Sequence, residues 1–214
     1  AGASRPAAAT GGDYFDYLSI SDSQLALAIG DVSGHGIGPA MLMAETRAYL
    51  RILTRNRNDL SLILTRANTM VGEDVGEERF VPMLLAKLDP EKGTLVHASA
   101  GHSPAFILGS DGAVKSELRR TGMPLGVMRD AEYTVSKPLR LVKGDVLVLL
   151  TDGLEEAANP EGELFGVDRI LETVHRNRQS KAAKIVESVF ETLKEFSGNT
   201  EQVDDLTMIV VKAE

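Results

Sequence analysis

Aspartates stand at the ends of three apolar segments that the sequence predicts as β-strands. They are Asp31 after Leu25–Ile29, Asp152 after Val146–Leu150, and Asp204 with Asp205 before Leu206–Lys212. If the last strand runs antiparallel to the other two, its start and their ends lie at one edge of a sheet. We therefore expect these carboxylates to converge. Asp13, just before the first predicted strand, could reach the same rim.

Converging carboxylates suit a particular chemistry. They repel one another and raise one another's pKa unless positive charge lies between them. A pair of divalent cations supplies that charge, activates a shared water near neutral pH and neutralises a phosphoryl group. The pattern therefore indicates metal-assisted hydrolysis of a phosphate ester. Asp31, Asp152 and Asp204 are the candidate catalytic residues.

The residue types in the chain indicate which metal would be used. The sequence has no cysteine, and its four histidines are scattered at positions 35, 97, 102 and 175. Thiolate ligands are thereby excluded, and the scattered histidines argue against a zinc cluster. Oxygen donors favour magnesium or manganese. Glycines after Asp31, at positions 34 and 36, let the backbone approach an ion where side chains are absent.

Composition limits the class of protein. A chain of 214 residues with 43% hydrophobic content can form one sizeable domain, and we take residues 1–214 as a single domain. A net charge of −8 argues against nucleic acid or an anionic membrane as the main partner. No apolar run approaches the roughly 20 residues of a membrane span. The absence of cysteine and of a signal peptide favours the cytoplasm. We expect the chain to be a C-terminal fragment of a longer regulatory protein.

The elements that would position the aspartates are short strands and paired helices. Four helices are predicted, at 39–51 or beyond, 60–71, 166–177 and 180–196. Strands are also predicted at Phe80–Leu88, Leu95–Ser99, Phe106–Leu108 and Tyr133–Leu141. A hairpin is predicted around Lys143-Gly144-Asp145, which would join the strands Tyr133–Leu141 and Val146–Leu150. Strands joined by turns, with helices in pairs, favour an α+β fold with antiparallel sheets.

Each signal alone also has an ordinary structural interpretation. Asp152-Gly153 after a strand is typical of a turn, and Asp204-Asp205 could be the solvated start of a strand. Ser33 and His35 do not form a hydrolase elbow, because Asp31 stands where that motif needs glycine. His102 is interpreted as a hydrogen-bonded structural histidine. Gly11–Phe15 resembles a diguanylate cyclase signature, but no second cyclase element follows.

Several motifs together resemble a known family in their order along the chain. They are Gly11-Gly12-Asp13-Tyr14-Phe15-Asp16, Gly30-Asp31-Val32-Ser33-Gly34-His35-Gly36, Ala100-Gly101-His102, Pro124-Leu125-Gly126, Thr151-Asp152-Gly153, Phe165-Gly166 and Asp204-Asp205-Leu206-Thr207. This set resembles bacterial phosphatase domains of the SpoIIE/RsbU type, a branch of the PP2C-like (PPM) serine/threonine phosphatases. The resemblance covers almost the whole chain. It implies a four-layer α-β-β-α sandwich of two antiparallel sheets flanked by helices.

The resemblance also implies a ligand set for two manganese or magnesium ions and no other cofactor. Asp31 would bridge both ions, the Val32 carbonyl would hold one, and Asp152 and Asp204 would complete a shell. Asp13 would act mainly through a metal-bound water. Residues next to the ligands that could support them are Asp16, His35 and Asp205, and for His35 a structural role at the glycine turn is the alternative. In the wider family an uncharged amide is tolerated at the position of Asp205, whose expected task is hydrogen bonding to the nearby turn.

By resemblance, the substrate is phosphoserine or phosphothreonine on a regulatory protein, typically a STAS-type anti-anti-sigma factor in a bacterial stress response. An upstream sensor or receiver domain would control activity by shifting the helices between residues 39 and 71, and a homodimer is an open alternative. The eukaryotic branch holds phosphate with an arginine where this chain has Ala8, and Arg5 is off-register. Two other classes stay open: a silent phosphoprotein-binding module, and a hydrolase of small phosphoesters.

Overall fold

The computed structural model describes residues 1–214 apart from 22, 35, 57 and 76–78. One sheet contains β1 (Gly2–Arg5), β6 (Ala105–Leu108), β7 (Val114–Leu118), β9 (Val146–Leu150) and β10 (Leu206–Lys212). The other contains β2 (Tyr14–Ser19), β3 (Leu25–Gly30), β4 (Met83–Asp89), β5 (Thr94–Ala100) and β8 (Leu139–Arg140). The helices are α1 (Ile37–Asn56), α2 (Leu60–Asp74), α3 (Asp152–Glu156), α4 (Gly166–Arg176) and α5 (Ala182–Ser197).

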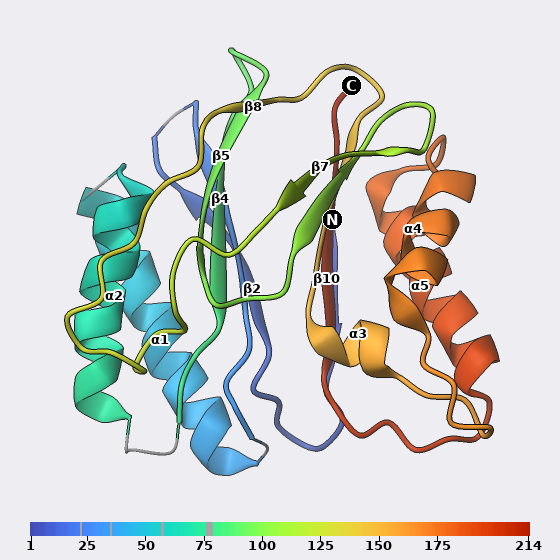
Figure 1. The fold of residues 1–214 in the computed structure, drawn as a ribbon, viewed down its shortest axis with the longest axis horizontal. Coiled ribbons are helices and arrows are strands. Elements are labelled where there is room, and N and C mark those ends of the chain that lie inside the picture. The colour runs from blue at the N-terminus through green and yellow to red at the C-terminus, as the bar shows by residue number, and fades with distance from the viewer. Residues whose placement is uncertain (22, 35, 57, 76–78) are drawn as a thin grey trace.

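These elements form four layers. The strand orders are β1-β10-β9-β6-β7 and β2-β3-β4-β5-β8, and all the pairings between named strands are antiparallel. Helices α1 and α2 cover the outer face of the second sheet, and α4 and α5 cover the outer face of the first (Figure 1). The α-β-β-α sandwich confirms the predicted fold class.

Sequence patterns explain the main layers. β9 reads Val-Leu-Val-Leu-Leu and is buried along its whole length, as expected for a central strand covered on both faces. Side chains from both sheets fill the layer between them, including Leu27, Leu84, Leu147 and Ile209. On α2 the apolar stripe is buried as predicted, and the Asp59 side chain caps the helix by accepting the Ser61 N–H at 2.9 Å.

The predicted hairpin around 143–145 is wrong. Of the predicted strand Tyr133–Leu141, only Leu139–Arg140 is regular, and it pairs with β5. β9 pairs instead with β10 and β6 in the other sheet. The turn at 143–145 therefore carries the chain from one sheet to the other. A local turn pattern does not reveal this, because the apolar β9 finds its partners far away in the sequence.

Other elements were absent from the sequence interpretation. β1 and β2 precede the strand that was expected to be first, β7 follows β6, and Asp152-Gly153 begins the short helix α3 rather than a simple turn. Within 1–21, 23–34, 36–56, 58–75 and 79–214, no helix has both the length and the apolar character needed to cross a membrane.

Candidate active site

The aspartates predicted at strand ends lie at one end of the sandwich. β9 and β10 pair antiparallel, so the end of β9 and the start of β10 bring Asp152 and Asp204 to the same end of their sheet. Asp31 follows β3 in the facing sheet. The charges of Asp152, Asp204 and Asp205 act on the Asp31 carboxyl, which indicates that the four residues are close. The expected single sheet edge is therefore wrong, because both sheets contribute.

Asp13 joins this group through hydrogen bonds. Thr151 Oγ1 donates to Asp13 Oδ2 at 2.8 Å, and the Asp13 backbone N–H donates to Asp205 Oδ2 at 3.2 Å. Asp205 Oδ1 accepts the backbone N–H of Ala7 at 2.8 Å. The buried Asp205 carboxylate thus fastens the segment between β1 and β2 to the start of β10. This attachment holds Asp13 where the charge of Asp31 acts on it.

Two glycines let these segments approach one another. A Cβ at Gly12 would lie 2.8 Å from the Val32 carbonyl oxygen and 3.2 Å from Asp31 Oδ1. A Cβ at Gly153 would overlap the carbonyl oxygen of Asp205. Larger residues would push the aspartate-bearing segments apart, since backbone atoms cannot give way as flexible side chains do. The glycines in these motifs therefore have a steric role at the site.

Burial and repulsion perturb two carboxyls. Burial, followed by repulsion from Asp152 and Asp204, raises the pKa of Asp31 to about 7. Burial raises the pKa of Asp13 to about 8, although hydrogen bonds from neighbouring threonine hydroxyls act in the opposite direction. Both carboxyls therefore hold a proton to higher pH than an ordinary aspartate does. A positive charge placed among these carboxylates would lower both pKa values.

A divalent cation fits this group by its donor chemistry. The donors are oxygens: the carboxylates of Asp13, Asp31, Asp152 and Asp204, and the carbonyl of Val32 beside Asp31. Magnesium and manganese prefer such oxygens. In the part of the chain that the structure describes, no three Asp, Glu, His or Cys side chains already lie close enough together to hold an ion. The carboxylates would therefore have to draw together around a bound cation.

The remaining candidates have different surroundings. Asp16 lies in β2, where its carboxylate accepts hydrogen bonds from Arg51 Nε and Nη2 at 2.6 and 2.8 Å and from the Tyr14 hydroxyl at 2.8 Å. These contacts join β2 to α1 and involve none of the converging aspartates. His35 lies outside the described residues. His102 is buried with Nδ1 2.9 Å from the Ser103 carbonyl oxygen, and its interpretation as a structural histidine stays a prediction.

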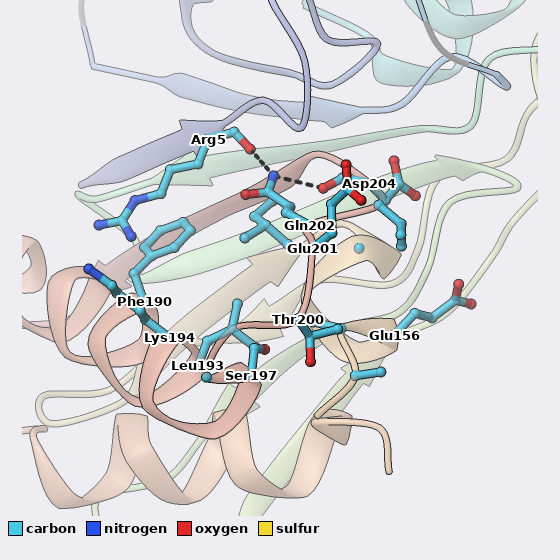
Figure 2. Close-up of a pocket in the computed structure, with 16 residues that line it drawn as sticks. Arg5, Glu156, Phe190, Leu193, Lys194, Ser197, Thr200, Glu201, Gln202 and Asp204 are labelled. Carbon is cyan, nitrogen blue, oxygen red and sulfur yellow. Dashed lines mark hydrogen bonds between the residues drawn. The ribbon is translucent and has the colours of Figure 1, made fainter. Parts of the chain in front are cut away.

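Sequence reasoning assigned no role to two residues that support the site. Thr151 bonds to Asp13, and the Gln202 side-chain amide donates to the carbonyl oxygens of Arg5 and Asp204, both at 2.8 Å. Gln202 thereby ties the segment before β10 to β1 (Figure 2). Thr151 stands in the motif Thr151-Asp152-Gly153 and Gln202 lies close to Asp204. Neither side chain is charged, so only their neighbours in space reveal what they do.

Comparison with known proteins gives a consistent result. The sequence model described as stage II sporulation protein E (SpoIIE) matches residues 21–214. Protein IcfG of Synechocystis sp. is 29% identical over 96% of this chain and 36% of its own length. Phosphoserine phosphatase RsbU of Bacillus subtilis is 29% identical over 97% of this chain and 61% of its own length. The chain thus spans about one third to three fifths of these relatives.

Solved structures agree on the fold. The SiaA-PP2C domain of Pseudomonas aeruginosa superposes with a TM-score of 0.86 at 22% identity, over 100% of this chain and 85% of that one. RsbX, solved in complex with magnesium, gives a TM-score of 0.70 at 21% identity over 98% of this chain and 92% of its own. At these identities the structural similarity establishes only the fold. The chemistry has to be inferred from the residues of this chain.

Proposed function

Because this chain belongs to the SpoIIE family, we propose that it is a metal-dependent protein phosphatase acting on phosphoserine or phosphothreonine. The observation that carries the proposal is the meeting of Asp13, Asp31, Asp152 and Asp204 at one end of a PP2C-type sandwich. Burial and repulsion there disfavour the charged carboxylates. Divalent cations would relieve that repulsion. The RsbU relative, named a phosphoserine phosphatase, supports the choice of substrate group.

The proposed ligands are the carboxylates of Asp31, Asp152 and Asp204, with the Val32 carbonyl and, more indirectly, Asp13. When bound, two manganese or magnesium ions would supply charge neutralisation at the phosphoryl group and activation of a water molecule. The chain's own part is to hold the oxygens in place. Thr151 orients Asp13 by its hydrogen bond.

Asp205 has a different proposed role. Its carboxylate accepts two backbone N–H groups and so keeps the segment between β1 and β2 in position. A residue with both oxygens engaged in this way acts through Asp13 rather than on the phosphoryl group. We propose it as a positioning residue.

The setting is proposed from the family alone. The natural substrate would be a phosphorylated STAS-type regulatory protein in a bacterial signalling pathway that controls a sigma factor. An upstream sensor or receiver domain would regulate the phosphatase, and the cytoplasm would be its compartment. A homodimer is compatible with this arrangement, and neither nucleic acid nor membrane insertion is part of it.

The direct test uses the purified domain with a phosphoserine peptide and an aryl phosphate. We expect hydrolysis with manganese or magnesium and none after chelation. Asp31→Asn and Asp152→Asn should each lower the rate by about a hundredfold or more, as expected when a ligand of the reacting centre is lost. Asp168→Asn, an exposed carboxylate in α4, is the matched control and should retain the parent rate.

Four outcomes would contradict the proposal. Activity that survives exhaustive chelation would exclude the metal, and a strict need for zinc would exclude the oxygen-ligand interpretation. Failure to hydrolyse either compound with any divalent metal, while the phosphopeptide still binds, would instead support the silent binding module. If the domain hydrolyses the aryl phosphate but does not hydrolyse the phosphoserine peptide, the result would support a hydrolase of small phosphoesters.

A further inference from the structure

A cleft of about 520 Å³ opens beside the converging aspartates. It lies between the end of β1, the segment from α3, the C-terminal half of α5 and residues 198–204 (Figure 2). Asp204 and Gly153 line it, and both also belong to the candidate active site. A polypeptide whose phosphoryl group lies at the aspartates could therefore continue directly into this cleft.

The wall of the cleft suits a polypeptide. Phe190, Leu193 and Leu206 line it and are buried, so they form an apolar base. Val203 also lines it, and its side chain is 82% exposed. An exposed apolar side chain at such a position gains from being covered by a partner. A bare phosphoester would leave this apolar surface in water.

The charged side chains that line the cleft are the basic Arg5 and Lys194 and the acidic Glu156, Glu201 and Asp204. In Figure 2, Arg5 and Lys194 lie at one end, and Asp204 and Glu156 lie at the other. The Arg5 guanidinium lies over the Phe190 ring, 4.3 Å from its centroid. Among the ion pairs of the described residues, none uses Arg5 or Lys194. The far end of the cleft therefore presents two cations that can meet an anion of a partner.

Resting on the proposed function, we propose that this cleft binds the segment of the protein substrate next to the phosphorylated residue. A carboxylate on that segment pairs with Arg5 and Lys194, while its apolar atoms cover Phe190 and Val203. A basic segment would place like charges together at that end, which disfavours binding. The cleft thus gives the phosphatase a preference for acidic sequence at one side of the phosphoserine.

The test compares phosphoserine peptides on the parent domain with manganese. A pair of aspartates is moved residue by residue along either flank of the phosphoserine, and each peptide is matched by one with asparagines. The readout is the ratio of kcat/KM for the aspartate peptide to that for its asparagine match. Because the ratio is taken within one enzyme variant, any general change in activity cancels. We expect a preference of about threefold to fivefold at one spacing, which is the scale of exposed ion pairs.

Variants assign the preference to the cleft. Lys194→Glu and Arg5→Glu should bring the ratio to one or below, and Lys194→Gln should give an intermediate ratio. Lys137→Glu, an exposed lysine in the segment before β8, changes charge equally and should keep the parent ratio. Lys194 lies on the exposed side of α5, so its variants test the idea even if Arg5→Glu disturbs β1.

Two results would overturn the inference while leaving the proposed function intact. One is hydrolysis of every peptide without preference for aspartate at any spacing. The other is a preference that persists unchanged in Lys194→Glu and Arg5→Glu. Absence of hydrolysis of all the peptides would overturn the proposed function itself, and the inference would fall with it.

Discussion

Asp204 and Asp205 are adjacent in sequence, and the structure gives them different environments. Asp204 is exposed and lines the cleft, and its Oδ1 accepts the N–H of Asp205 at 2.8 Å. Asp205 is buried, and each of its two oxygens accepts a different backbone N–H. An amide at 205 can offer only one acceptor oxygen, and its NH₂ would face an N–H donor. Tolerance of an amide at 205, expected from the family, is therefore at odds with this geometry.

We predict that the two amide substitutions fail in different ways. Asp204→Asn should raise the manganese concentration needed for half-maximal activity by about tenfold or more, with little change in Tm, since each tenfold corresponds to about 1.4 kcal/mol. Asp205→Asn should lower stability by about 1–3 kcal/mol, the cost of leaving a buried donor unpaired. Manganese titration of activity and thermal unfolding, measured on both variants, separate the two. Equal shifts in metal requirement would show that both carboxylates serve the ions.

At the scale of elements, one ion pair attaches α1 to the sheet beneath it. Arg51 in α1 makes two hydrogen bonds to the buried Asp16 of β2. The same helix begins shortly after Asp31 and Val32. The contact between Arg51 and Asp16 therefore fixes α1 against β2, and an upstream domain of the kind proposed above would have to change this contact to shift the helix.

Removing the Arg51 side chain should destabilise the protein measurably. Arg51→Ala leaves the buried Asp16 carboxylate with the Tyr14 hydroxyl, the Tyr17 backbone N–H and only the more distant Arg47, so we expect a clear loss in the free energy of unfolding. Arg47 is the internal control, because its Nε lies 3.9 Å from the same carboxylate and its side chain is 51% exposed. Arg47→Ala should cost about 0.5 kcal/mol or less. Denaturant unfolding of both variants gives the comparison, and similar losses would refute the assignment to Arg51.

At the scale of the whole molecule, an acidic chain of net charge −8 brings buried carboxyls together at one end of its sandwich. Burying these carboxyls close together disfavours their charged forms. The pKa is therefore raised from an ordinary value of 3.8 to about 7 for Asp31 and about 8 for Asp13. The folded, metal-free protein therefore holds protons that the unfolded chain releases. Metal and protons would compete for the same oxygens.

This competition predicts a pH dependence of stability. For an acid whose pKa is raised by folding, the stabilisation is complete below the unfolded value of about 3.8 and is lost as pH rises through the folded value. In the presence of a chelator, the contribution of Asp31 and Asp13 to the free energy of unfolding should thus fall between about pH 4 and pH 8. The fall should be about 1–2 kcal/mol per group after allowance for partial exposure. Thermal unfolding across this range should show a flatter decline for Asp31→Asn than for the parent. Manganese should raise Tm more at pH 8 than at pH 5. Parallel curves for parent and variant in chelator would contradict the prediction.

The sequence by itself determined the elements with strong local patterns and the residues with distinctive chemistry. The apolar stripe of α2, the short apolar strands β9 and β10, and the aspartates at their ends could be predicted, because helical and strand periodicities are written in neighbouring residues. The ordered motifs further indicated the family and the α-β-β-α fold. The ligand assignments for Asp13, Asp31, Val32, Asp152 and Asp204 stay predictions.

Only the tertiary structure decided which segments meet. It assigned β8 and β9 to different sheets, brought Asp31 across from the sheet opposite Asp152, and gave Asp205 its two backbone donors. It also revealed Thr151 and Gln202 beside the site and the cleft with Arg5. The physical reason is that strand pairing and hydrogen bonding at the site join residues far apart in the chain, whereas local patterns specify only which face of an element is apolar.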